Sequence, residues 1–376
     1  MDLNAFKADV DALGARMVAE RADPAHLAHL HRIITITNVL YALGVATMWL
    51  PAYTVLPWLC ISTATFARWS MVAHHVMHGG YDRYSRHTFA RGARRFWDWF
   101  DWIQPEAWNH EHNKMHHCAL GEWPGDPDVV EEVFGLVRRA RVPRVAKYAV
   151  FALAACTWKW VYYAPGTLMY RRGVTPVTWL PRIVGVVLAP RVALELVLAM
   201  VPYILYCFVL LPSACWLVMG EWRTALLNAL IAEIVTNVHS FVTIATNHTG
   251  SDVHRFDGAC SARGEFELRQ ILGSVDVTTN SCLGDFAWGY LNYQVEHHLW
   301  PNLSMLGCRR AHPALVAICA RHGIPMVREE GAWAGMVSRV RKTAEVAVGA
   351  ASMRRFVLAD WDGSDPKKTW MQGRCE

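Results

Sequence analysis

The chain has 376 residues, of which 53% are hydrophobic and 18% are charged, and it contains 18 Trp. An average soluble domain carries about 25% charged residues, so this composition favours a protein embedded in lipid over a water-soluble one. The formal net charge is +5, but the basic residues form short clusters beside apolar runs, which argues against nucleic acid as a partner and favours a membrane surface.

The first strongly apolar run extends from Ile33 to Phe66 and is interrupted only by Pro51 and Pro57. One transmembrane helix needs about 20 residues, so the run predicts two helices with a tight turn near Pro51. The preceding segment, residues 1–32, is polar and does not have the pattern of a signal peptide. A hairpin returns the chain to its starting side, so the histidine-rich segment that begins at His74 is expected in the compartment of the N-terminus.

Basic residues are concentrated between the first apolar run and residue 150. The positive-inside rule places such loops on the cytoplasmic side of a membrane. The following run, Tyr148–Ala164, is aromatic and apolar, but Lys159 interrupts it, so we expect it to lie in the membrane interface rather than to cross. The basic residues are Arg83, Arg86, Arg91, Arg94, Arg95, Arg138, Arg139, Arg141, Arg144 and Lys147.

A second apolar pair follows, from about Ile183 to Val218 and from about Thr224 to Thr246, and it again predicts a hairpin. Its second arm contains Glu233, Asn237 and His239. Polar side chains are costly in hydrocarbon, so these three are expected to face the interior of the helical bundle.

Three short clusters hold seven of the 18 histidines. His74 and His78 are four residues apart, and so are His112 and His116, which in an α-helix places each pair on one face with both imidazoles directed at one point. This geometry is typical of metal chelation. The full set is His74, His78, His112, His116, His117, His297 and His298.

Three clusters on one side of a membrane supply more ligands than a single zinc ion takes, since zinc sites use three or four protein ligands. The sequence therefore predicts two metal ions, although imidazole suits iron, copper, nickel and zinc alike. A metal-ion transporter is a remote alternative, because transport sites lie near the bilayer midplane within repeated halves, and here the clusters lie outside the apolar runs.

These features predict an all-α membrane protein with two transmembrane helical hairpins, hence four spans, and a cytoplasmic helical cap that holds a di-metal site. Residues 1–32 form a cytoplasmic N-terminal segment, residues 33–325 the membrane domain, and residues 326–376 a cytoplasmic C-terminal tail. About the last thirty residues are expected to be loosely held, as chain ends usually are.

The order HxxxH, HxxxHH and QxxHH between two apolar hairpins resembles the membrane fatty acid desaturases and their hydroxylase relatives, from about Leu40 to Pro325. Asp126-Pro127-Asp128 and the stretch LNYQVEHHLWPNL are similar to acyl-lipid and acyl-CoA desaturases. The resemblance implies a desaturase domain with two iron ions that reduces O2 and introduces a double bond into a long-chain fatty acyl group.

The resemblance also implies one further metal ligand near the end of the fourth span. His248 is the preferred residue, and His239, about 13.5 Å deeper in a straight helix, is the weaker choice. His75 and His110 are further weak candidates for metal ligands. Candidates for orienting the ligands are Asp126, Asp128, Gln294 and Asn292, with Glu296 beside them; the two aspartates could instead cap a helix.

Two departures from the family pattern affect partners and outcome. His75 stands where the family often has an acidic residue, and Gln294 begins the third box in place of a histidine. The Gln form is known from desaturases with a fused cytochrome b5 domain, but no HPGG haem motif occurs here, so the electron donor is expected to be a separate protein, such as cytochrome b5 or ferredoxin with its reductase.

The substrate is expected to be an acyl chain linked to a lipid, to CoA or to a carrier protein. The same site could instead perform hydroxylation, ketolation or oxidative decarboxylation of a long apolar substrate. A channel lined by Trp102, Trp108 and Trp288 would admit it, although these residues could equally form an interfacial belt. A multi-pass protein of the bacterial inner membrane is favoured over one of the endoplasmic reticulum.

Overall fold

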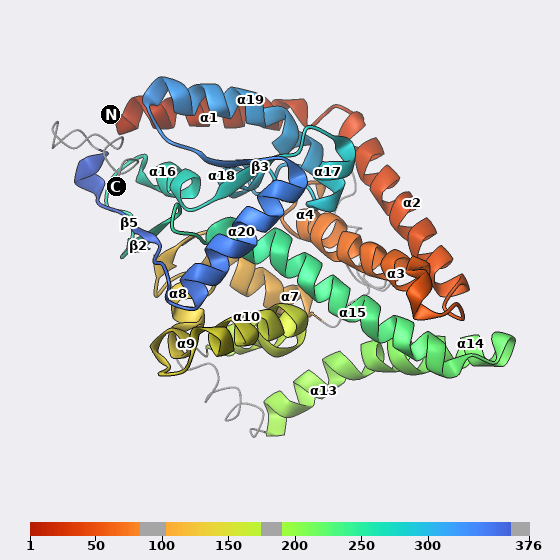
Figure 1. Ribbon diagram of the computed structural model, residues 1–376. Helices are drawn as coiled ribbons and strands as arrows, with labels where there is room; N and C mark the ends of the chain where they lie inside the picture. The colour runs from red at the N-terminus through yellow and green to blue at the C-terminus, as the bar shows by residue number, and fades with distance from the viewer. Residues whose placement is uncertain (83–102, 174–189, 362–376) are drawn as a thin grey trace.

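The computed structural model describes residues 1–82, 103–173 and 190–361, and the fold is mostly helical (Figure 1). The helices are α1 (Leu3–Glu20), α2 (Ala25–Ala46), α3 (Leu56–Phe66), α4 (His74–Met77), α7 (Pro105–Trp108), α8 (Val130–Val133), α9 (Gly135–Arg139), α10 (Arg144–Trp158), α11 (Ala164–Arg171), α13 (Pro190–Leu205), α14 (Leu211–Met219), α15 (Trp222–Ile244), α16 (Glu265–Leu272), α17 (Cys282–Ala287), α18 (Gln294–Leu299), α19 (Met305–His322) and α20 (Ala332–Ala347). The described residues also contain five short strands, which the sequence did not predict: β1 (Glu122–Trp123), β2 (His254–Asp257), β3 (Val275–Thr278), β4 (Val327–Glu330) and β5 (Arg354–Arg355).

The first predicted hairpin is present as α2 and α3, with its turn at Pro51. The two helices approach closely at Gly44, where an added Cβ would lie 2.7 Å from Cγ1 of Ile61. Small residues allow helix backbones to pack closely in this way. Asn228 of α15 donates hydrogen bonds to the carbonyl oxygens of Met48 and Leu50, at 2.9 and 2.8 Å, and so attaches the second hairpin to this turn.

The second hairpin, α13 and α14 followed by α15, contains two helical stretches that are long and apolar enough to cross a membrane. They span Leu194–Met219 and Trp222–His248. Only 6% of the most apolar part of the first stretch is buried, and an apolar surface of this kind is one that lipid covers. Within the described residues α2 and α3 do not meet the same criteria, so four spans remain a prediction.

Polar side chains inside the second hairpin face the bundle interior, as expected. The ammonium of Lys159 lies 2.7 Å from Oε1 of Glu233, and both side chains are largely buried. Asn237 accepts a hydrogen bond of 2.8 Å from the backbone N–H of Lys159. The run predicted as an interfacial helix therefore contacts α15 directly, and it continues through a π-helical segment, Lys159–Tyr163, into α11.

Helices from both ends of the chain form a cap over the part of the hairpins that lies away from their turns (Figure 1). α1 and α19 lie side by side there, above α16 and α18 (Figure 1). Buried side chains such as Phe6, Leu268, Val295 and Leu315 hold these four helices together. The third histidine cluster is on α18, so the cap fixes its position.

The segment predicted as a tail is largely packed. β4 pairs in parallel with β3, and β5 pairs in parallel with β2. On α20, the fully buried Arg339 binds Asp252 with Nη1 at 3.0 Å from both carboxylate oxygens. The expectation of loosely held residues is wrong for residues 347–361, where Met353 and Trp361 are buried, because long-range strand pairing anchors them. The rest of the tail lies outside the described residues.

Candidate metal centre

The first two histidine clusters follow or lie within π-helical segments, Ala67–Ala73 and Asn109–His116. π-helical turns are rare and are frequent at functional sites. In a π-helix the hydrogen bond joins residues i and i+5, and the N–H of His117 accordingly donates to the carbonyl of His112 at 3.0 Å. The change from α-helical to π-helical hydrogen bonding determines which histidine side chains lie close together.

A first group contains His74, His78, His112 and His297, whose ligand atoms all lie within 4.8 Å of one another. His74, at the start of α4, and His78, directly after its end, lie on the same side, as predicted, with ring centroids 4.9 Å apart. Nε2 of His74 lies 2.9 Å from Nε2 of His297, which comes from α18. Nε2 of His117 lies 3.2 Å from Nε2 of His112, at the border of this group.

A second group contains His116, His248 and His298. His112 and His116, expected to direct their imidazoles at one point, fall into different groups, although their rings stack 5.2 Å apart. In the π-helical register His112 approaches His117, and His116 turns to His248 and His298, with ring centroids 4.8 and 5.0 Å away. The two groups are adjacent, since the rings of His117 and His298 stack at 4.2 Å.

Burial keeps most of these imidazoles neutral. Burial lowers the pKa of six of them well below the usual value. Neighbouring imidazoles lower each of these pKa values further. Among the described residues, Nε2 of His78 and Nε2 of His298 have no hydrogen-bond partner although they are buried. The six are His74, His78, His112, His117, His297 and His298.

This donor set fits two metal ions. Neutral imidazole is the form that binds metal, and a buried polar atom without a partner costs about 1–3 kcal/mol. Nε2 of His74 and Nε2 of His297 can share a proton in a hydrogen bond, and when both rings carry their proton on Nδ1 the two Nε2 lone pairs are available to one cation. Imidazole groups of this kind suit iron among other transition metals.

Asp126 orients the second group. It is 2% exposed, and its Oδ1 lies 2.9 Å from Nδ1 of His116. Burial disfavours the imidazolium of His116, but the charge of Asp126 outweighs it, and the pKa of His116 is raised. The backbone N–H groups of Gly121 and Asp128 also donate to Asp126, at 2.6 and 2.9 Å, so its carboxylate is fixed.

Two glutamines approach the same group. Oε1 of Gln270, on α16, lies 3.2 Å from Nδ1 of His298, which leaves Nε2 of this ring free for a metal. Sequence reasoning missed Gln270, and no local signal marks it. Nε2 of Gln294 lies 2.9 Å from Nε2 of His248, so the glutamine that replaces the expected histidine sits at the second group.

Four other predicted candidates lie in neither group. His239 stacks on Phe66 and lies 2.6 Å from the carbonyl oxygen of Ala287. His75 is buried beside the first group, 3.1 Å from the carbonyl oxygen of Met71, and His110 is only half-buried.

The fourth candidate, Asn292, donates to Asp285 Oδ1 at 2.9 Å, away from the histidines. Glu296 faces away from them as well, toward His312, with Oε1 2.8 Å from Nδ1 of that ring. Asp276 lies 3.2 Å from the same nitrogen. Burial raises the pKa of Glu296 to about 8, while the pKa of His312 is raised to about 10, because its two acidic partners outweigh its own burial.

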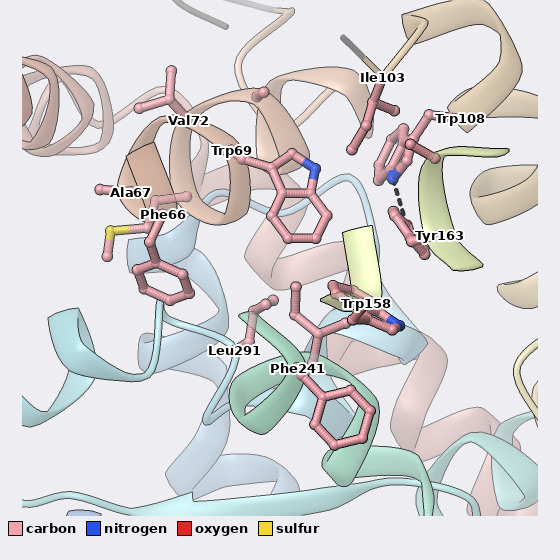
Figure 2. Packing of buried hydrophobic residues seen from close by; sticks show 14 of the residues in the cluster. Phe66, Ala67, Trp69, Val72, Ile103, Trp108, Trp158, Tyr163, Phe241 and Leu291 are labelled. Atoms are coloured by element: carbon pink, nitrogen blue, oxygen red, sulfur yellow. Dashed lines mark hydrogen bonds between the residues drawn. The ribbon is translucent and has the colours of Figure 1, made fainter. Parts of the chain in front are cut away.

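A cavity of about 410 Å³ reaches the histidines from α9, α10 and α15. His112, His116 and His248 line one end, and most of the wall is apolar, including Trp158 and Phe241. Trp158 packs between Trp69 and Phe241 in Figure 2. Among predicted channel residues, Trp102 lies outside the described residues. Trp108 and Trp288 are fully buried and do not line the cavity, and the indole N–H of Trp108 donates to Tyr163 (Figure 2).

Carboxyl groups lie near the histidine end of this cavity. Asp128 lines it, accepts a hydrogen bond of 3.1 Å from Tyr162, and has a pKa raised to about 6 by burial. Glu111, which directly precedes His112 of the second cluster, is 2% exposed, and burial raises its pKa well above the usual value. Sequence reasoning did not select Glu111.

Membrane-length helices beside two adjacent groups of buried histidines define a helical membrane-type protein with a centre that could hold two metal ions. A family model for fatty acid desaturases matches residues 24–329, and the chain belongs to this family.

Individual relatives match more loosely. The "NADPH-dependent stearoyl-CoA 9-desaturase" of Mycobacterium tuberculosis is 23% identical over 266 residues, which is 68% of this chain and 58% of that protein. The "Delta(8)-fatty-acid desaturase 2" of Arabidopsis thaliana is 28% identical over 140 residues, 37% of this chain and 30% of that protein. The "Delta 8-(E)-sphingolipid desaturase" of Lachancea kluyveri is 25% identical over 242 residues, 60% of this chain and 40% of that protein. The chain thus spans less than two thirds of the length of each.

Proposed function

We propose that the protein is an oxygen-dependent di-iron desaturase that introduces a double bond into a long-chain fatty acyl group. The observation that carries this proposal is the cavity of about 410 Å³, which is apolar along most of its length and ends on members of both histidine groups. A cavity of about 300–1,000 Å³ is typical of a small-molecule site. An apolar chain in it would present a C–H bond to the centre.

The two groups would hold one iron ion each. Bound iron would supply the reduction of O2 and the removal of two hydrogens from an unactivated chain, which no amino-acid side chain can perform. The proposed ligands are His74, His78, His112, His117 and His297 for one ion, and His116, His248 and His298 for the other.

The chain's own residues orient and protect the reaction. Asp126 and Gln270 fix two imidazoles of the second group through hydrogen bonds to Nδ1, as ligand histidines require. The apolar wall excludes water and aligns the acyl chain. Asp128, with its raised pKa of about 6, is placed to hold or release a proton at the histidine end of the cavity.

We further propose that the centre lies on the cytoplasmic side of a bacterial inner membrane and that electrons arrive from a separate donor protein, such as ferredoxin or cytochrome b5 with its reductase. The basic residues that follow the second histidine cluster support this orientation, since cytoplasmic loops are enriched in arginine and lysine. The apolar surface of the second hairpin supports membrane insertion.

Iron analysis combined with gas chromatography of cellular lipids tests the proposal. Wild-type protein, His297→Ala and the control His322→Ala, a histidine of α19 that binds Asp9, are expressed in the same host. We expect two irons per chain and a new unsaturated acyl product for the wild type and the control, and loss of both for His297→Ala. Hydroxylated, ketone or shortened products with normal iron would establish the alternative chemistry, and a wild-type protein without iron would refute the metal centre.

A further inference from the structure

The cavity opens sideways, toward the surroundings of α9 and α10. Four of its apolar lining residues are also strongly exposed: Leu136, Val150, Leu153 and Val161. The exposed fractions of Leu136 and Leu153 are 61% and 64%. Large apolar side chains that are exposed together mark a contact with lipid or with another apolar surface. A chain could therefore enter the cavity through an apolar opening.

Three arginines stand beside this opening, at the end of α9, in the following loop and at the start of α10. Arg139, Arg141 and Arg144 are exposed, and none forms an ion pair with a described residue. Six residues separate Arg144 from Val150 on α10, which is about 9 Å at 1.5 Å per residue. The arginines are therefore close enough to the opening to bind the phosphate of a lipid whose acyl chain enters the cavity.

Exposed apolar residues alternate with these arginines. Val142 and Val145 are 49% and 75% exposed and stand between and just after the basic residues. A helix with basic and apolar residues of this kind lies in the interface of a bilayer, where arginine meets phosphate and the apolar side chains meet acyl chains.

We propose that the substrate is an acyl chain of an anionic phospholipid, which enters the cavity from the bilayer between α9 and α10 while its phosphate binds Arg139, Arg141 and Arg144. This inference rests on the proposed function, because it takes the cavity as the acyl site. The exposed apolar residues around the opening favour a phospholipid over an acyl-CoA, because a phospholipid already holds its acyl chains in the bilayer that would cover these residues.

Photolabelling tests the inference without requiring catalysis. The full chain in phosphatidylcholine vesicles receives traces of phosphatidylglycerol carrying a diazirine in mid-chain, and labelled peptides are mapped by mass spectrometry. The same experiment is run with an acyl-CoA of the same chain. The triple variant Arg139→Gln/Arg141→Gln/Arg144→Gln is compared with a triple variant of equal charge, at the exposed Arg16, Arg263 and Arg341.

We expect phosphatidylglycerol to label residues 130–137 and 150–161, with labelling about tenfold or more lower in the first triple variant and unchanged in the second, because each basic residue near an anionic surface contributes to binding. Ala154→Phe, which fills the cavity, should abolish labelling, whereas Ala152→Phe on the exposed side of α10 should not.

Labelling of these peptides by acyl-CoA alone, equal labelling in both triple variants, or no labelling of the cavity would each overturn the inference. Normal labelling in a protein that lacks iron or makes no unsaturated product would leave the lipid site standing and would refute the desaturase function instead.

Discussion

Replacing Asp126 by Asn should weaken metal binding at the second histidine group. The Asp126 carboxylate accepts from three N–H groups, namely those of His116 Nδ1, Gly121 and Asp128, at 2.9, 2.6 and 2.9 Å. An amide has one acceptor oxygen, so its NH2 group must face either the imidazole donor or the Gly121 donor. Asn at position 126 therefore leaves a buried donor facing a donor.

The size of the effect follows from this geometry. A buried donor without an acceptor costs about 1–3 kcal/mol, and loss of a carboxylate partner from a ligand histidine lowers metal affinity by about 10–100-fold. The substitution also removes the negative charge of Asp126, which raises the pKa of His116 and so makes this imidazole a stronger metal ligand. We expect Asp126→Asn to release half of its iron at a chelator concentration about 10–100-fold lower than the wild type does.

The assay is iron content of the purified protein after equilibration with increasing chelator. Asp257→Asn, at an exposed aspartate that pairs with Arg355, is the control and should behave as the wild type. Thermal unfolding of the metal-free forms separates a loss of fold from a loss of ligand orientation. If Asp126→Asn and the wild type lose half of their iron at the same chelator concentration, Asp126 stabilises only its own loop and does not orient His116, and the reasoning is refuted.

Three further outcomes are expected. Gly44→Ala should destabilise the protein by about 1–3 kcal/mol through overpacking of the first hairpin, measured as a lower Tm, whereas Gly166→Ala, with nothing within 4 Å of the added Cβ, should not. His248→Ala should lose iron and His239→Ala should retain it, as measured by iron content. The opposite result would show that His239, and not His248, is the metal ligand. The pKa of His312 is raised from 6.5 to about 10, so its stabilising contribution is complete below pH 6.5 and is lost as pH rises toward 10. The wild-type Tm should therefore fall between pH 7 and 10 more than that of His312→Gln; equal slopes would contradict this.

Much of the centre could be predicted because its signals are local. Apolar runs broken by prolines predict hairpins, and two hairpins return three histidine clusters to one side of the protein. His74 and His78 share a face simply because four residues make about one helical turn. The structure brings all three clusters and His248 together, as this reasoning requires.

Other features depend on partners far away in sequence. Gln270 contacts His298 from a different helix, and β4 pairs with β3 although about fifty residues of chain separate them. No local sequence pattern predicts either contact. The packing of residues 347–361 is missed for the same reason. The π-helical register at Asn109–His116 is also invisible in a sequence that satisfies the α-helical spacing equally well.

The angle between neighbouring residues of a helix explains why adjacent histidines suit a two-metal centre. Neighbouring residues on an α-helix point about 100° apart, so adjacent histidines cannot both face one ion. On α18, His297 joins the first group and His298 the second, with their ring planes at 82°. His117 and His116 divide in the same way, with an interplanar angle of 87°. The pair His297-His298 thus supplies one histidine to each group, and His116-His117 places one histidine in the second group and one at the border of the first. The pair His74-His75 does not divide in this way, because His75 lies in neither group.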